Sequence, residues 1–274
     1  MKLRTATLTA LLSLAPYLPA QAPQALPSAK EVIAKAIERG KAESKLNTDA
    51  QYGWTQVVIE EKLGKDGQVE ERKQTEYEPV RLLGRRFLRV HKVNGQPPTG
   101  DELKKANERE KKFRDSVADE QRKKKNDDDD DDDVEINEEL VNRFQFTVVG
   151  KEVVNGRSSY VLTFLPKTGV KLPEKKRMDR LLNRLEGRVW LDAELYSIMK
   201  VDMALTEPTT LMAGLGSVRE LEWKIELFPV EPGIFMPKSM AVKVDGRRLF
   251  SSMRIRQQVE FSNYRKLSQL AEMK

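Results

Sequence analysis

The chain has 274 residues, a formal net charge of +6 and no cysteine. Charged residues make up 34% of it and mix both signs along the sequence, which argues against a nucleic-acid-binding surface. The lack of cysteine excludes disulfides and a lipidated cysteine. Because the chain has a single histidine, no glycine-rich phosphate loop and no Gly-x-Ser-x-Gly turn, we expect no enzymatic activity, no metal site and no cofactor.

The first twenty residues, MKLRTATLTALLSLAPYLPA, have the form of a secretory signal peptide. Lys2 and Arg4 precede an apolar stretch that is too short to span a bilayer, and small residues follow it. We expect cleavage after Ala20, or after Ala22 at most, and loss of Lys2 and Arg4 lowers the formal charge from +6 to +4. An exported chain of this size without disulfides predicts a periplasmic location in a Gram-negative-type envelope, without stable membrane insertion.

A short amphipathic helix is predicted after Ser28, which forms a capping box with Glu31. Gly40 is expected to weaken or end this helix. Its apolar face comprises Val32, Ile33, Ala36 and Ile37.

Three strands are predicted between Tyr52 and Val93. Asp66-Gly67 supplies the turn between the first two, and the third spans residues 80–93 and ends at Asn94-Gly95. One face of the second strand carries only polar side chains, so the sheet meets water there. Parallel sheets are covered on both faces, so this pattern indicates an antiparallel sheet.

Residues 99–143 form a charged insertion. Its first part has helix-forming composition with few apolar residues, which predicts a solvent-exposed helix. Seven aspartates, Asp127 to Asp133, follow. A run of like charges repels itself, and the spacing of an EF-hand loop is absent, so we interpret the run as a solvated spacer and not as a calcium site. A short helix is predicted at residues 134–144.

The second half has the clearest strand pattern. It begins with a hairpin around Asn155-Gly156. A helix is then predicted in PEKKRMDRLLNRLEG, with an apolar face made of Met178, Leu181, Leu182 and Leu185. The strand pair EGRVWLDAELYSIMKVDMAL and three further long strands follow, joined as a meander. The segment LTEPTTLMAGLGS is either a loop that closes over a cavity mouth or a packed crossover.

Alternation in these strands puts apolar side chains on one face. Two interpretations stay open: the face is a closed core beneath helices, or it is an open or lidded hydrophobic cavity. Methionine side chains are flexible and polarizable, which suits a surface that accepts acyl chains. Asp192 and Glu194 are expected on a solvated face and not as an acid–base pair. The candidate ligand-binding residues are Met199, Val201, Met203, Leu221, Trp223, Ile225, Met236, Met240, Val242 and Met253.

Four stretches carry a resemblance to a known family: HKVNGQPPTGDELKKANEREKK, FQFTVVGKEVVNGRSSYVLTFLPK, LLNRLEGRVWLDAELYSIMKVDM, and MPKSMAVKVDGRRLF with the later EFSNYRK. The pattern resembles the periplasmic lipoprotein-carrier superfamily (LolA/LolB-like), especially outer membrane lipoprotein-sorting proteins. The resemblance implies a curved antiparallel half-barrel whose concave side is plugged by helices around a cavity for acyl chains. A relative in the superfamily is a periplasmic sensor that restrains an anti-sigma factor. The charged insertion departs from the compact carriers.

The sequence therefore predicts a mainly β (α+β) fold, a curved antiparallel sheet covered on its concave face by a few short helices. Residues 21–98 and 144–266 are expected to form one domain, interrupted by the insertion at 99–143 and followed by a tail at 267–274. The predicted function is binding of lipid or lipoprotein acyl chains in the periplasm, with no nucleic-acid partner. The alternative is a non-enzymatic regulatory or protein-interaction module that contacts envelope proteins through the charged helix and the Asp run.

Overall fold

The computed structural model describes residues 25–46, 48–122, 138–172, 174, 179–212, 216–248 and 251–273. The predicted signal peptide at residues 1–20, the Asp run at 127–133 and Met178 lie outside these ranges. Over the described ranges, no helix combines the length and the apolar character that a membrane crossing requires.

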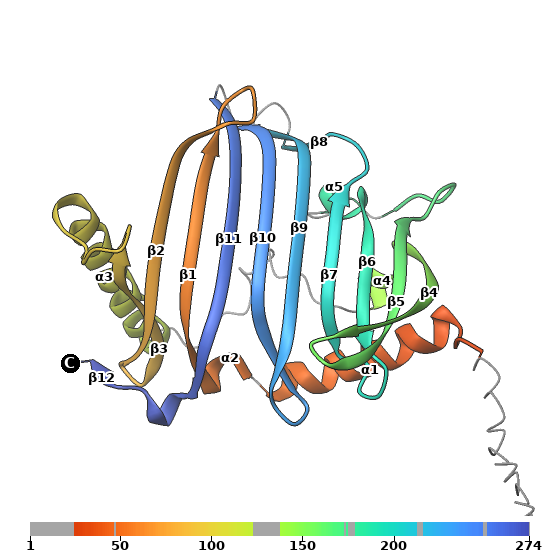
Figure 1. The fold of residues 1–274 in the computed structure, drawn as a ribbon, viewed down its shortest axis with the longest axis horizontal. Helices are drawn as coiled ribbons and strands as arrows, with labels where there is room; N and C mark the ends of the chain where they lie inside the picture. Colours follow the sequence, from red (N-terminus) through yellow and green to blue (C-terminus); the bar gives the residue numbers. More distant parts are fainter. Residues whose placement is uncertain are drawn as a thin grey trace, which may run out of the picture.

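One large, open, curved sheet dominates the molecule (Figure 1). Within the described residues its strands follow the order β12-β2-β1-β11-β10-β9-β7-β6-β5-β4, with β3 added beside β2 and β8 beside β9. All neighbours are antiparallel except β12, which runs parallel to β2. The strands are β1 (Tyr52–Leu63), β2 (Val69–Leu82), β3 (Arg85–Val93), β4 (Phe144–Val154), β5 (Arg157–Pro166), β6 (Leu185–Asp192), β7 (Ile198–Leu205), β8 (Thr209–Met212), β9 (Gly216–Glu231), β10 (Ile234–Arg248), β11 (Ser251–Lys266) and β12 (Glu272–Met273).

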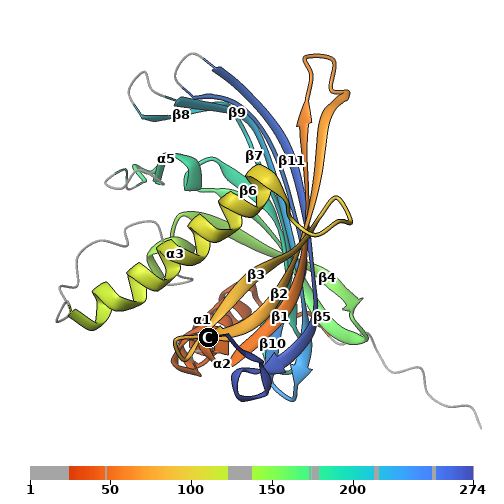
Figure 2. The same cartoon turned by 90° about the vertical axis from the view of Figure 1, so that its left-hand side faces the viewer.

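The helices lie on the concave side of this sheet (Figure 2). They are α1 (Ala29–Leu46), α2 (Thr48–Gln51), α3 (Gly100–Arg122), α4 (Glu138–Val141) and α5 (Asp179–Leu182), with a short 3-10 turn at Leu267–Gln269. The predicted fold class, a curved antiparallel sheet with a few helices on its concave face, is confirmed.

Strands from before and after the insertion share this sheet. β1 pairs with β11, so the first and last long strands are neighbours near its centre. At the end of the chain, β12 adds to β2, and the Arg81 N–H donates to the Ala271 carbonyl at 2.8 Å. The residues after 266 therefore belong partly to the sheet and are not only a tail.

Helix α1 begins as predicted. The Ser28 N–H and hydroxyl donate to the Glu31 carboxylate at 3.0 and 2.9 Å, and the Glu31 N–H donates to the Ser28 hydroxyl at 3.3 Å. Gly40 does not end the helix, which continues to Leu46. Val32 is buried against Leu162, Val189 and Leu191 of the sheet, so tertiary packing outweighs the weak helix propensity of one glycine.

Two predicted boundaries were wrong. The third strand does not begin at Val80, because Leu83 and Gly84 form a turn with positive φ angles of 52° and 76° and Val80–Leu82 belongs to β2. In the second half, the described helix covers only Asp179–Leu182, while Leu185 starts β6 and pairs with Leu205. Leu185 packs with Phe144 and Phe164, so its apolar side chain belongs to a core cluster of the sheet and not to a helix face.

Part of the segment between β7 and β9 is a strand, which neither prediction included. Thr209–Met212 forms β8, which pairs antiparallel with β9, with Thr209 opposite Val218 and Thr210 opposite Ser217. Residues 213–215 of this segment lie outside the described ranges.

Helix α3 is not simply exposed to solvent, as the sequence suggested. The Phe113 ring lies 5.0 Å from the Phe87 ring of β3, and Val117 is 2% exposed. The Lys73 ammonium of β2 donates to both carboxylate oxygens of Glu102, each at 2.8 Å. The charged insertion is therefore anchored to the sheet at its first helix.

Candidate functional site

Cross-strand register aligns side chains of the concave face into rows. The first row is apolar over eight strands. It consists of Val58, Val259, Met240, Ile225, Val201, Val189, Leu162 and Val148, each opposite the next.

The second row runs beside the first, two residues along each strand. It consists of Lys73, Glu60, Gln257, Val242, Trp223, Met203, Gly187, Phe164 and Phe146. This row is polar at its β2 end and apolar from Val242 onward.

Most of the predicted ligand-binding residues lie together on this face. Val201, Ile225 and Met240 belong to the first row, and Met203, Trp223 and Val242 belong to the second. Leu221 lies opposite Val244, and Met253 opposite Gly246, further along the same strands. The alternation of apolar residues in β9, β10 and β11 was therefore sufficient to assign their inward faces.

Met199 lies on the opposite face from Val201, contrary to the prediction. The register between β6 and β7 shifts after Trp190, so Met199 is an extra residue in a β-bulge. Its side chain is fully buried against Trp190, Val161 and Val154 on the convex side. Strict alternation fails at this point because one residue is inserted into the strand.

Met236 also lies apart from the rows. It is 2% exposed and packs in a cluster with Tyr52 and Trp54, near the turn between β9 and β10. A register shift between Pro237 and Ser239 separates it from Met240. We therefore assign Met236 to the protein's own core.

The helices cover only part of the concave face. Helix α1 packs on the first row through Val32, while Leu140 of α4 and Leu182 of α5 pack around Phe144, Phe164 and Leu185. The part of the face over β4 to β6 is thus a closed core, and the half-buried Val201 and Met203 of β7 pack at its edge.

The middle of the face, over β9, β10 and β11, is partly open. Trp223 is 37% exposed, and its neighbours Ile225, Met240, Val242 and Ile255 are half-buried. Helix α1 packs over β4 to β7, and α3 packs against β3, on either side of this region. The closed-core interpretation therefore holds for one part of the sheet, and an open hydrophobic cavity over β9 to β11 stays a prediction.

A polar pocket of about 370 Å³ adjoins the open region on the α3 side. It lies over β1, β2, β3 and β11, and its polar lining includes Gln56, Glu60, Lys73, Thr75, Arg109 and Gln257. This pocket was not predicted from the sequence. The only signal was Gln257, a polar interruption of an apolar strand face.

Arg109 of α3 forms one wall of this pocket. Its guanidinium lies 5.0 Å from the Tyr77 ring and 5.2 Å from the Phe87 ring, and Nη1 donates to the Leu88 carbonyl. These contacts fix the arginine head against β2 and β3.

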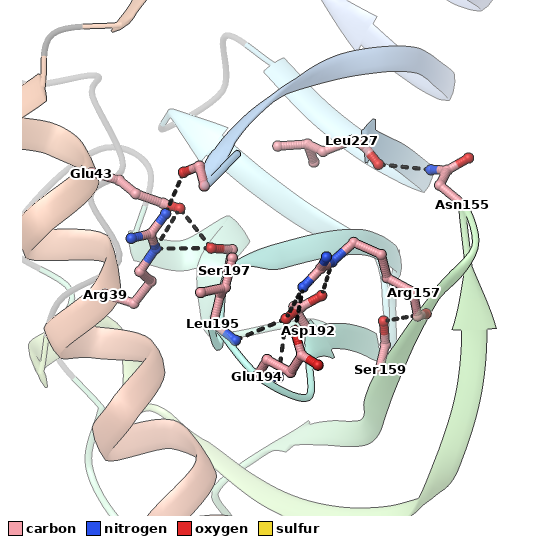
Figure 3. Close-up of polar contacts among 11 residues, drawn as sticks. Arg39, Glu43, Asn155, Arg157, Ser159, Asp192, Glu194, Leu195, Ser197 and Leu227 are labelled. Carbon is pink, nitrogen blue, oxygen red and sulfur yellow. Dashed lines mark hydrogen bonds and ion pairs between the residues drawn. The ribbon is translucent and has the colours of Figure 1, made fainter. Parts of the chain in front are cut away.

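A network of polar side chains fixes α1 to the lower end of the sheet (Figure 3). The Arg39 guanidinium donates to Glu43 and to the Ser197 hydroxyl, both at 2.9 Å, and to the Gly233 carbonyl at 2.5 Å. Ser197 in turn donates to Glu43 at 2.7 Å. This network joins α1 to the β6–β7 and β9–β10 turns.

Asp192 is buried, contrary to the predicted solvated face, while Glu194 is exposed in the turn after β6. Arg157 donates to both Asp192 oxygens at 2.5 and 3.0 Å (Figure 3). Burial raises the pKa of Asp192, but hydrogen bonds from Arg157 and from the N–H groups of Leu195 and Glu194 outweigh burial, so this pKa is lowered. The carboxylate stays ionised and holds a turn, which is a structural role.

No family model matches this chain, and no curated protein matches it in sequence. Among solved structures, matches include an outer membrane lipoprotein-sorting protein domain from Vibrio parahaemolyticus, with 13% identity and a TM-score of 0.36, covering 89% of this chain and 95% of that one. A LolA superfamily protein from Nitrosomonas europaea has 10% identity and a TM-score of 0.31, covering 91% and 96%.

The MucA/MucB complex of Pseudomonas aeruginosa also matches, with 11% identity and a TM-score of 0.24, covering 86% of this chain and 99% of that chain. All three matched structures have TM-scores below 0.5 and at most 13% sequence identity to this chain.

Proposed function

We propose that this protein binds acyl chains of lipids or lipoproteins on the open part of its concave face, and carries them in the periplasm without catalysing a reaction. The observation that carries the proposal is the half-exposed apolar surface over β9, β10 and β11, with Trp223 37% exposed at its centre. Contiguous apolar surface of this kind marks binding sites on proteins that are not inserted in membranes.

The dimensions of the face suit an acyl chain. Neighbouring strands are about 4.8 Å apart, so the second row spans roughly 14 Å between β11 and β7. One leaflet of a bilayer has a hydrocarbon depth of roughly 15 Å, half of the total core. A single chain lying across the strands would therefore reach from Gln257 to Met203.

The chemistry of the face favours loose specificity for the chain. Each methylene buried against it contributes about 0.8 kcal/mol, whatever its position along the chain. Met203 and Met240 supply flexible side chains that adapt to chains of different shape. Selectivity for one acyl length is not expected from such contacts.

Adjacent residues of β9 on opposite faces provide a matched test. Trp223 faces the concave side opposite Val242, and Lys224 faces the convex side opposite Asp202. Trp223→Glu places a charge on the proposed binding face, whereas Lys224→Glu makes a charge change on the other face. We expect Trp223→Glu to abolish uptake of a fluorescent fatty acid and Lys224→Glu to leave uptake at the wild-type level.

Thermal unfolding of both variants establishes that each is folded before uptake is compared. Met203→Glu, one strand away in the same row, repeats the test at an independent position. Uptake that survives both Trp223→Glu and Met203→Glu in folded protein would refute the proposed binding face.

A further inference from the structure

The second row of the concave face changes character between β11 and β10. Val242 and Trp223 lie on one side of this point, and Gln257, Glu60 and Lys73 lie on the other. The first row shows no such change, since Val58 and Val259 continue it to β1. The polar side chains of the second row therefore lie together over β11, β1 and β2.

Two of these polar side chains are available to a ligand. Glu60 is exposed and Gln257 is half-buried, and among the residues that the structure describes neither side chain makes a hydrogen bond or ion pair to another residue. Both line the pocket of about 370 Å³, a volume within the range of about 300–1,000 Å³ typical of ligand pockets.

The charges around the pocket are balanced. Lys73 is neutralised by Glu102, to which it donates at 2.8 Å. Arg109 uses Nη1 on the Leu88 carbonyl, and a guanidinium has five N–H donors, so further donors remain for a ligand. One cation and one unpaired carboxylate are then left, Arg109 and Glu60, and a ligand with a single net charge would be repelled by one of them.

We propose that this pocket holds the zwitterionic head group of a phospholipid whose acyl chains lie on the apolar part of the second row. The phosphate faces Arg109, and the ammonium group faces Glu60. The amides of Gln56 and Gln257 supply further hydrogen bonds to the ester and phosphate oxygens. This inference rests on the proposed function, because it names the head group of the lipid that the apolar face binds.

Three lipids with identical chains test the head group separately from the chains. The purified protein is incubated with an equimolar mixture of dioctanoyl-phosphatidylethanolamine, dioctanoyl-phosphatidylglycerol and dioctanoylglycerol, and the bound lipids are compared by native mass spectrometry. We expect the zwitterionic lipid to exceed the anionic one by about two- to fivefold, the effect of one partly exposed charge. Glu60→Gln should bring this ratio to about one, since it removes the repulsion of the anionic lipid.

The next residue of β1 supplies the control. Glu61 lies on the convex face, where Arg256 donates to it at 2.6 Å, so Glu61→Gln removes the same charge without touching the pocket. Arg109→Gln should reduce both phospholipids relative to dioctanoylglycerol, which has no phosphate. Thermal unfolding shows whether each variant is folded.

The outcomes separate this inference from the function on which it rests. Equal binding of the two phospholipids by the wild type, or the same change of ratio in Glu60→Gln and Glu61→Gln, would overturn the head-group pocket while leaving the acyl-binding face in place. Binding of none of the three lipids would overturn the proposed function, and the head-group pocket with it.

Discussion

Gln257 of β11 lies directly opposite Val242 of β10, and this pair marks the boundary between the polar and apolar parts of the concave face. On the Val242 side, Trp223 and Met203 continue the row with apolar side chains. On the Gln257 side, Glu60 and Lys73 continue it with charges. A single row of neighbouring residues thus provides both environments that an amphipathic molecule needs.

Tryptophan fluorescence should report ligand binding directly. Of the three tryptophans, Trp223 is 37% exposed, whereas Trp54 and Trp190 are 8% and 3% exposed. We expect a fatty acid to shift the emission to shorter wavelength and to protect it from acrylamide quenching, because the chain covers the Trp223 ring. In Trp223→Phe the ligand-induced change should disappear while a radiolabelled fatty acid still binds; an unchanged shift in this variant would show that the ligand lies elsewhere.

Two methionines separated by only four positions should respond differently to truncation. Met199 is fully buried on the convex side, so Met199→Ala should lower the free energy of unfolding by about 2–5 kcal/mol and leave fatty-acid affinity unchanged. Met203 is half-buried on the proposed binding face, so Met203→Ala should weaken fatty-acid affinity by about fivefold, equivalent to about 1 kcal/mol of lost apolar contact. Chemical denaturation and a binding titration on the same two variants check both statements. The reverse pattern would mean that the ligand occupies the convex face.

The attachment of α3 should weaken in acid. The hydrogen bond from Lys73 lowers the pKa of Glu102 below its ordinary value, so the carboxylate is more acidic in the folded than in the unfolded chain. The contribution of Glu102 to the free energy of unfolding is therefore fully present above the ordinary glutamate pKa of about 4.3. It is lost as the pH falls through the lower pKa that Glu102 has in the folded chain. Glu102→Gln should cost about 0.5–1 kcal/mol at pH 7 and nothing at a pH below both values. A difference between wild type and variant that persists under acid conditions would contradict this assignment.

Asp192 should matter far more for stability than its neighbour Glu194. Both carboxylates contact Arg157, but Asp192 is 1% exposed and also accepts the N–H groups of Glu194 and Leu195 at 3.0 and 2.8 Å. Asp192→Asn should lower the free energy of unfolding by about 3 kcal/mol, since it leaves the guanidinium without its buried partner. Glu194→Gln, at a side chain that is 82% exposed, should cost at most about 0.5 kcal/mol. If both substitutions lowered the free energy of unfolding by the same amount in urea denaturation, burial would not determine how strongly each carboxylate stabilises the fold.

Local patterns predicted the sheet well because its long strands follow strict alternation. The inward faces of β9, β10 and β11 were assigned from the sequence, and so was the capping box at Ser28 and Glu31. These features depend on residues two to four positions apart. The prediction of Met199 was wrong because a single inserted residue reverses the face, and nothing in the local pattern marks a bulge.

The features that form the proposed site depend on distant residues and were not predictable in the same way. Helix α1 covers β4 to β7 and leaves Trp223 open, an outcome set by where α1 docks and not by the sequence of β9. Arg109 reaches the polar pocket because Phe113 and Glu102 attach α3 to β2 and β3. From the sequence, the position of Arg109 in a charged helix indicated only a solvent-exposed side chain.

The most direct measurement is mass spectrometry, under native and denaturing conditions, of residues 21–274 exported to and purified from a bacterial periplasm. We expect phospholipid or lipopeptide bound in about a one-to-one ratio, released on denaturation, and absent from Trp223→Glu. A protein that is empty when purified, and that also fails to take up a fluorescent fatty acid, would contradict the acyl-binding face and direct attention to protein partners.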